Sequence, residues 1–160
     1  MVEPGQNQAG ESRFRSRSEH NLDAKGRLNI PSRFREILRR DHGEEMLLVT
    51  NWEKCLKAYP VPVWERIESD LLHEGSKQEG MDEFVRYVLS GLTECPLDKQ
   101  GRILLPPPLR ADFNIRKEVV LTGMLDHFEI WDRQTWEEAT RQTRDNFNSF
   151  KANLSNLRIL

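Results

Sequence analysis

An internal repeat constrains this chain of 160 residues more than any other feature of its sequence. Residues 22–36 read LDAKGRLNIPSRFRE, and residues 97–111 read LDKQGRILLPPPLRA. An internal repeat sets the architecture, because each copy builds the same structural unit. The sequence therefore predicts two pseudo-equivalent halves that share one core within a single domain. The same amino acid recurs 75 positions later at six places: Leu22/Leu97, Asp23/Asp98, Gly26/Gly101, Arg27/Arg102, Pro31/Pro106 and Arg35/Arg110.

Each copy begins with the pattern of a tight turn followed by a strand. Asp23 and Gly26 are three positions apart, as are Asp98 and Gly101, and this spacing suits a type I turn with Asp at position i and Gly at i+3. Glycine is favoured at the last position of the turn because it adopts positive φ at little steric cost. With the apolar residues before each turn, the short strands that follow predict a hairpin-like β unit in each copy. A proline then opens a short helix, since proline is tolerated at the first helical position.

The similarity between the halves continues beyond the repeated phrase. Residues 46–50 match 119–122 as a buried strand, and residues 55–59 match 127–131 as a strand with alternating apolar residues. A Trp-Glu pair follows in each half, inside an expected helix. Each half therefore predicts the order β-turn-β-α-β-β-α. The fold class is α+β, mostly β with short helices.

The repeat also indicates boundaries along the chain. An apolar stripe at helical spacing lies between the halves and covers either the core or a neighbouring subunit. The stripe consists of Met81, Phe84, Val85, Val88, Leu89 and Leu92. We expect a disordered extension over 1–12, a first repeat over 13–67, a linking amphipathic helix over 68–93, a second repeat over 94–143, and a C-terminal helix or tail over 144–160.

Charge is distributed unevenly along the chain, although the net charge is only −2. Residues 1–40 hold nine Lys and Arg against five Asp and Glu, and residues 96–117 hold five against two. Residues 41–95 hold five Lys and Arg against twelve Asp and Glu. Positive charge thus collects around both copies of the repeat, which is typical of a protein that binds a polyanion. The alternative is chance clustering on a solvated surface.

The sequence offers little support for catalysis or metal binding. Four histidines occur without a second ligand at metal-site spacing, and there is neither a Gly-rich phosphate loop nor a Gly-x-Ser-x-Gly elbow. Cys55 and Cys95 are far apart in apolar stretches, which fits buried hydrophobic residues in a reducing cytoplasm. No apolar run approaches the length of a membrane span, and the polar start lacks a secretory signal. We expect no enzyme activity, metal, cofactor, small-molecule substrate or membrane association.

The basic residues of the repeat are the main candidates for contact with nucleic acid. Arg27 and Arg102 each follow a glycine in a tight turn, from which a guanidinium can reach guanine O6 and N7 or bridge phosphates. Asp23 and Asp98, four residues earlier, cap the turns and hold the guanidinium groups. Lys25 adds positive charge at the first turn. Further basic residues flank the first copy: Arg15, Arg17 and Arg33.

An alternative role for the two Asp–Arg pairs is structural. In that interpretation they are internal ion pairs that stabilise the turns, and DNA contact takes place elsewhere. The two copies also differ, because Gln100 replaces Lys25 and a triple proline stiffens the helix start in the second copy. We therefore interpret the first copy as the main DNA-contacting element. The second copy is then scaffold, with a supporting contact through Arg102.

The double motif resembles the MraZ family of bacterial regulators over residues 13–141. The first motif of that family maps onto Asp23, Lys25 and Arg27, and the second maps onto Asp98 and Arg102. The resemblance implies a SpoVT/AbrB-type swapped-hairpin scaffold, with two tandem half-barrels that form one pseudo-two-fold domain. The sequence departs from the family pattern in its added polar dozen at the N-terminus and in the triple proline.

The resemblance also implies a function. It predicts a cytoplasmic, nucleoid-associated transcription factor that binds double-stranded DNA at short direct repeats. The expected target is its own operon, the division and cell-wall gene cluster, and the expected assembly is a ring-shaped homo-oligomer. Two alternatives are an AbrB-like antitoxin that pairs with a toxin, and a structural ring protein of cell division that does not bind DNA.

Overall fold

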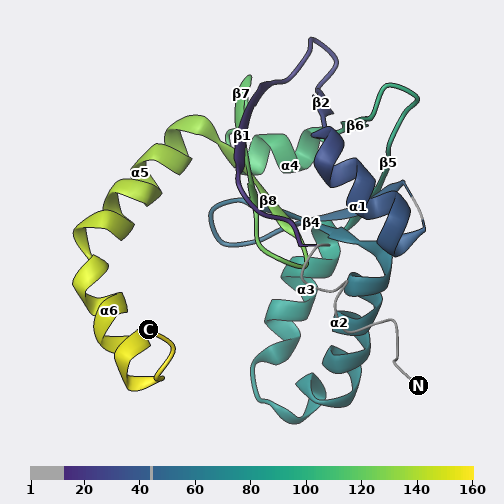
Figure 1. Ribbon diagram of the computed structural model, residues 1–160. Helices are drawn as coiled ribbons and strands as arrows, with labels where there is room; N and C mark the ends of the chain where they lie inside the picture. Colours follow the sequence, from purple (N-terminus) through teal and green to yellow (C-terminus); the bar gives the residue numbers. More distant parts are fainter. Residues whose placement is uncertain (1–12, 44) are drawn as a thin grey trace, which may run out of the picture.

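A computed structural model describes residues 13–43 and 45–160, so the expected extension over 1–12 lies outside the described residues. The fold is α+β, as predicted (Figure 1). The strands are β1 (Arg17–Asn21), β2 (Arg27–Asn29), β3 (Met46–Asn51), β4 (Leu56–Pro60), β5 (Thr93–Pro96), β6 (Arg102–Leu104), β7 (Glu118–Gly123) and β8 (Phe128–Asp132). The helices are α1 (Ser32–His42), α2 (Val61–His73), the 3-10 turn η1 (Gly75–Lys77), α3 (Met81–Gly91), α4 (Pro107–Asp112), α5 (Arg133–Asp145) and α6 (Phe147–Asn156).

The order of elements confirms the internal repeat. Both halves run β-β-α-β-β-α, from β1 to α2 and from β5 to α5. Pro31 and Pro106 have extended φ and ψ and cap α1 and α4, so each proline lies one position before the helix it was expected to open. The segment 68–93 contains the end of α2, η1 and α3.

The halves exchange strands, so the strands on either side of each turn pair with strands of the other half. Six strands form a sheet in the order β1-β7-β8-β4-β3-β5, and β2 pairs with β6 in a separate two-stranded ribbon. Thus β1 pairs with β7 of the second half, while β5 pairs with β3 of the first. Pairing across the halves satisfies backbone N–H and C=O groups of strands from both copies. This exchange is the swapped-hairpin arrangement that the family resemblance implies.

A pseudo-two-fold axis relates the halves and passes through two strand pairs. In the ribbon, Leu28 pairs directly with Ile103, its equivalent in the repeat. In the large sheet, Lys57 of β4 pairs with Glu129 of β8, which occupy equivalent positions in the two halves. The short ribbon therefore lies at the junction of the two copies, where both repeated phrases meet.

Buried side chains lie on both faces of the six-stranded sheet. The larger cluster lies beneath α1, α4 and the ribbon, and includes Phe14, Phe34 and Phe128 with ring centroids 5.0–5.6 Å apart. The smaller cluster packs Tyr59 and Trp64 against the sheet beneath α2 and α3. Alternation along β3 sends successive side chains into different clusters, as a strand buried on both faces requires.

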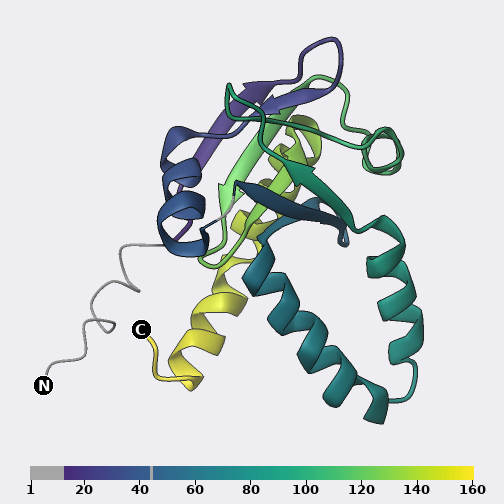
Figure 2. The ribbon, with the colours of Figure 1, turned by 90° about the vertical axis from the view of Figure 1, so that its right-hand side faces the viewer.

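Helices α2 and α3 form a hairpin that protrudes from the sheet (Figure 2). The apolar stripe of α3 faces the core only in part, because Val88 is its one fully buried residue whereas Phe84 and Leu89 are exposed. Helices α5 and α6 lead away from the other side of the body (Figure 1). Among the described residues, no helix is long and apolar enough to cross a membrane.

Candidate nucleic-acid interface

The first turn has the local geometry that the sequence predicts. The Gly26 N–H donates to the carbonyl of Asp23 at 3.0 Å, which closes a four-residue turn. The Asp23 carboxylate accepts the backbone N–H groups of Lys25 and Arg27, both at 2.9 Å. Gly26 has a φ of 83°, a value that a residue with a Cβ adopts only at a cost. The turn therefore depends on Gly26 for its backbone conformation and on the Asp23 carboxylate as the acceptor of two N–H groups.

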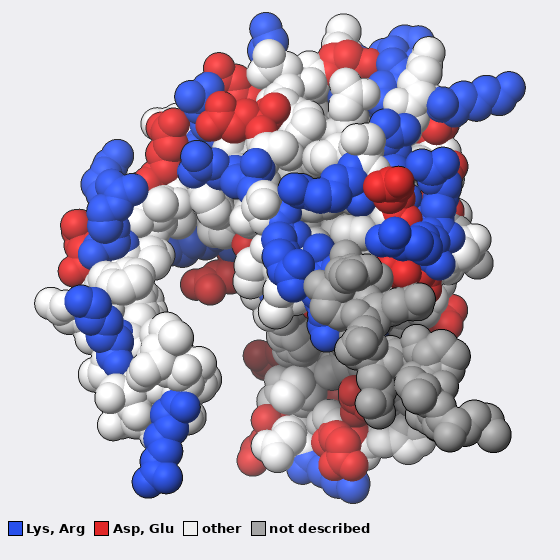
Figure 3. Space-filling model, in the orientation of Figure 1, with Lys and Arg blue, Asp and Glu red and all other residues white. Residues whose placement is uncertain are grey.

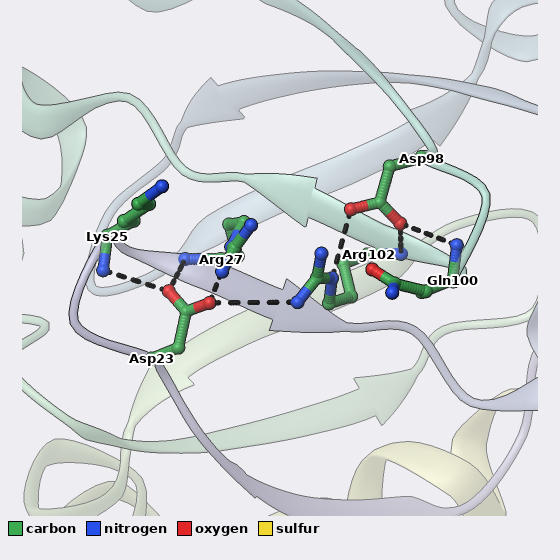
Figure 4. Close-up of polar contacts among 6 residues, drawn as sticks. All are labelled: Asp23, Lys25, Arg27, Asp98, Gln100 and Arg102. Carbon is green, nitrogen blue, oxygen red and sulfur yellow. Dashed lines mark hydrogen bonds and ion pairs between the residues drawn. The ribbon is translucent and has the colours of Figure 1, made fainter.

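The second turn closely repeats this geometry. Gly101 donates to the Asp98 carbonyl at 2.9 Å, and the Asp98 carboxylate accepts the N–H groups of Gln100 and Arg102. Gly101 has a φ of 75°. Because β2 and β6 are antiparallel, the two turns lie at opposite ends of the ribbon, with both arginines between them (Figure 4).

Each arginine is held by the aspartate of its own turn. Arg27 Nε donates to Asp23 Oδ2 at 2.5 Å, and Arg102 Nε donates to Asp98 Oδ2 at 2.9 Å. A guanidinium has five N–H donors, so the Nε contact uses one and the Nη groups keep the fork that fits a phosphate or a guanine edge. The side chains of Arg27 and Arg102 are 34% and 23% exposed. Ion pairing and DNA contact are therefore compatible roles for the same residues.

One ion pair joins the two copies. Arg102 Nη1 lies 3.9 Å from Asp23 Oδ2, so the first carboxylate faces an arginine of each copy (Figure 4). The backbone N–H of Arg27, assisted by its guanidinium and by the Lys25 N–H, lowers the pKa of Asp23 to about 2. The pKa of Asp98 is also lowered, and the hydrogen bond from the backbone N–H of Arg102 is the main cause. Both carboxylates are thus ionised at neutral pH.

The two turns are also locked together through backbone and side chains. The Ile30 N–H donates to the Gly101 carbonyl at 3.0 Å, and the Leu105 N–H donates to the Gly26 carbonyl at 3.1 Å. The Arg110 guanidinium lies so close to Gly26 that an added Cβ would meet its Cζ at 2.7 Å. Arg35 occupies the matching place at Gly101, where an added Cβ would meet its Cδ at 2.5 Å. Each glycine turn is therefore backed by an arginine of the other copy.

Both arginines and Asn29 share the outer face of the ribbon with one exposed apolar residue, Leu104. Leu28 and Ile103 point inward and are buried, so their neighbours point outward. Arg27 is opposite Leu104, and Arg102 is opposite Asn29. Asn29 and Leu104 are exposed, as are Lys25 and Gln100 in the turns. The result is a narrow, two-stranded, cation-bearing surface.

The remaining predicted residues lie beside α1. Arg15 and Arg17 are exposed, and Ser16 between them has a φ of 74°, so regular strand geometry begins only at Arg17, the first residue of β1. Arg33 on α1 donates through Nη2 to the Arg15 carbonyl at 2.8 Å, which ties this basic segment to the helix. Lys and Arg side chains gather over α1 and the strands above it (Figure 3).

Four residues of the site were missed by the sequence reasoning. Lys99 lies exposed in the second turn, so each turn carries one lysine, displaced by one position. Asn29 was overlooked because the outward face of β2 is defined only by its pairing with β6. Arg35 and Arg110 recur in the repeat, and that recurrence was the available signal for their role behind the turns.

The histidines, cysteines and carboxylates of the described residues are the groups to consider for metal binding or nucleophilic chemistry. No cluster of three or more His, Cys, Asp or Glu side chains is placed to hold a metal ion in that part of the chain. Cys55 and Cys95 are buried as predicted, and burial raises the pKa of the Cys95 thiol to about 11. A protonated, buried thiol is a poor nucleophile. His127 stacks on Tyr59 with ring centroids 4.6 Å apart.

Two copies of a turn-and-strand unit that exchange strands about a pseudo-two-fold axis define a tandem swapped-hairpin protein. A family model described as MraZ protein, antitoxin-like, matches residues 14–86 and again residues 88–157. The chain belongs to the MraZ family.

Curated relatives agree with the family model. A protein of Syntrophobacter fumaroxidans is 43% identical over 138 residues, which cover 86% of this chain and 91% of the relative. One of Desulforapulum autotrophicum is 46% identical over 78% of this chain and 83% of the relative. One of Leuconostoc citreum is 39% identical over 88% of this chain and 96% of the relative. All three are named transcriptional regulator MraZ, which is not the name of an enzyme class.

Proposed function

We propose that the protein is a sequence-specific, DNA-binding transcriptional regulator. The observation that carries the proposal is the outer face of the β2–β6 ribbon, where Arg27, Asn29 and Arg102 lie between two turns that each expose a lysine. The major groove of B-DNA is wide enough to admit a two-stranded β-ribbon. Arginine pairs with guanine and asparagine with adenine through bidentate hydrogen bonds. The name that the relatives carry supports the same function.

In the proposed complex the ribbon enters the major groove. Arg27 and Arg102 present their Nη groups to base edges, while Asp23 and Asp98 keep both guanidinium groups oriented. Phosphate contacts position a protein on the duplex, and base contacts provide sequence specificity. The phosphate contacts come from Lys25 and Lys99 in the turns and from the basic residues beside α1: Arg15, Arg17 and Arg33.

The proposal extends to the arrangement on the genome. One ribbon covers few base pairs, so a single subunit binds weakly. A ring of subunits that contacts consecutive short direct repeats raises the effective concentration of each further ribbon and multiplies the affinity. As the family resemblance implies, the proposed target lies upstream of the protein's own division and cell-wall operon, and the proposed location is the nucleoid.

The test is a gel-shift titration with DNA from upstream of the protein's own gene. Arg27→Ala removes a bidentate contact worth about 1–3 kcal/mol, so affinity should fall roughly 5- to 150-fold. Arg39→Ala is the matched control, because Arg39 pairs with Glu45 at the end of α1 and lies outside the ribbon. Wild-type affinity of the Arg27 variant would remove that residue from the interface.

Two other functions have distinct tests. The antitoxin-like description of the family model favours a small toxin as partner, and copurification of such a protein in stoichiometric amounts would support it. A structural ring protein would show no salt-dependent affinity for DNA. Fluorescence anisotropy with labelled duplex at several salt concentrations separates that case from the regulator, because each phosphate contact adds to the salt dependence.

A further inference from the structure

The C-terminal helices form an arm with almost no burial. From Arg141 to Leu160 every residue is exposed except Leu154, which is half-buried. Phe147 is 50% exposed, and Leu157 is 68% exposed. Isolated helices of this length are marginal in water, and helices in proteins are stabilised mainly by packing of an apolar face. Packing of its exposed apolar residues against another surface would therefore stabilise the arm.

An apolar groove lies on the protruding α2–α3 hairpin. It has a volume of about 390 Å³ and is lined by apolar side chains of both helices together with Glu68 and Asp82. Leu89 is 44% exposed there, although it belongs to the stripe that sequence periodicity assigns to a buried face. The apolar lining consists of Leu71, Leu72, Met81, Val85 and Leu89, with Gly75.

Charge favours the arm as the occupant of this groove. Residues 61–92, which contain the hairpin, hold three Lys and Arg against seven Asp and Glu. Residues 146–160 hold two Lys and Arg and no acidic residue. On the face shown in Figure 3, Lys and Arg side chains stand along the lower part of the arm, and the visible part of the hairpin shows both Asp and Glu and Lys and Arg. An apolar centre with a complementary charged margin is the usual composition of a protein interface.

The arm of one chain does not lie on its own hairpin. Figure 1 shows α6 and the α2–α3 hairpin on separate sides of the molecule, and α6 packs against α5. We propose that α6 of one chain docks in the α2–α3 groove of a second copy, with Phe147, Phe150 and Leu154 as its contact residues. Arm and groove are different surfaces, so the contact is heterologous, and repetition closes a ring when the rotation permits. The inference rests on the proposed function and deepens it, because it names the interface of the proposed ring.

The test uses one full-length variant for each surface. Phe150→Asp places a charge on the apolar face of the arm, and Leu89→Asp places one in the groove. Asn148→Asp and Ser90→Asp are the matched controls, because they add the same charge to the same helices at exposed positions that do not line the groove. Light scattering after size exclusion should give the mass of one chain, 18.8 kDa, for each variant, and a larger wild-type assembly for each control.

Mixing the two variants identifies the pair of surfaces. Each variant keeps one intact surface, so an equimolar mixture should give a species with twice the mass of one chain and nothing larger. A monomeric wild-type protein, a variant with the wild-type mass, or a mixture without the two-chain species would each overturn the inference. Circular dichroism melts confirm that both variants fold, which is expected because Phe150 and Leu89 are exposed.

Two further measurements distinguish docking between copies from membrane contact and from DNA binding. If Phe150→Asp kept the wild-type mass but no longer sedimented with anionic phospholipid vesicles, the arm would be a membrane contact and the docking would be wrong. Arg27→Ala should keep the wild-type mass while it loses DNA affinity. Phe150→Asp should still bind a single-repeat duplex at low salt. Failure of ring assembly and failure of DNA binding are thus read from different variants.

Discussion

At the scale of a single residue, the Asp23 side chain contacts arginines of both copies of the repeat. Its carboxylate accepts two N–H groups of its own turn, contacts Arg27, and lies 3.9 Å from Arg102 of the other copy. A carboxylate that accepts several N–H bonds is strongly favoured in its ionised form. The same contacts that orient the arginines therefore make the stability of the turn depend on pH.

The pH dependence has a defined sign. The pKa of Asp23 is lowered from 3.8 to about 2 by the fold, so its contribution to the free energy of unfolding is complete above about pH 4 and is lost as pH falls through 2. Asp23→Asn, which cannot ionise, should be less stable than wild type at pH 6, and the difference should shrink between pH 4 and pH 2. Urea unfolding at each pH measures it. A difference that stays constant with pH would contradict the assignment.

The lysines of the two turns should contribute equally to salt dependence. Lys25 and Lys99 are both exposed beside the ribbon, so each neutralises about one phosphate in the proposed complex. Lys25→Ala and Lys99→Ala should each lower the slope of log affinity against log salt by about 1. Lys54→Ala, in the loop before β4, is the control and should leave the slope unchanged. A change for Lys25 alone would mean that the first copy dominates contact, as its sequence indicates.

Gly26 and Gly43 separate backbone strain from close packing. Both have positive φ, but an added Cβ meets Arg110 only at Gly26, and it meets no described atom within 4 Å at Gly43. Gly43→Ala should destabilise by about 1–2 kcal/mol from the backbone alone. Gly26→Ala should cost about 1 kcal/mol more, because the guanidinium must move.

A double-mutant cycle with Arg110→Ala measures the part of that cost that belongs to the contact. Equal destabilisation at the two glycines, or a coupling near zero between Gly26 and Arg110, would mean that Arg110 does not support the turn.

At the scale of elements, the sequence was a good guide to local structure and a poor guide to pairing. Turn geometry, the starts of α1 and α4, and the buried strands follow from residues close in sequence, and these were predicted to within a residue or so. The partner of β2 is β6, which lies 75 positions away, and no local pattern distinguishes it from β1. The repeat does not reveal the strand exchange, because two similar phrases are equally compatible with strand pairing within a copy and with strand pairing between copies. Only the family resemblance indicated the exchange.

Strand exchange makes the halves one cooperative unit. Leu28 and Ile103 are buried and directly opposite each other, so Leu28→Ala and Ile103→Ala should each cost about 2–5 kcal/mol. Their effects should be non-additive, since the residues touch. Chemical denaturation should give one transition, with the same midpoint by circular dichroism and by tryptophan fluorescence. Two separate transitions would contradict the shared core.

At the scale of the whole molecule, charge separation was predicted and its spatial arrangement was not. Counting charges along the chain placed positive charge around both repeats, and the fold brings those repeats to one ribbon. The stripe of α3 was expected to cover the core or a neighbour, and periodicity alone does not distinguish these cases because both need the same apolar spacing. In the structure Val88 is buried in the core, whereas Leu89 is exposed beside a groove, so the core covers only part of the stripe.

The pairing of β2 with β6 has a consequence for the newly made protein. The ribosome releases the first turn long before residues 102–104, so β2 has no strand to pair with while the second half is being synthesised. A truncated product that ends within α3 would contain Lys25, Arg27 and the basic residues of α1, yet it would lack the ribbon that arranges them. The paired arrangement of Arg27 and Arg102 therefore forms only after the second copy has been synthesised, and we expect fragments from interrupted translation to lack the proposed DNA-binding surface.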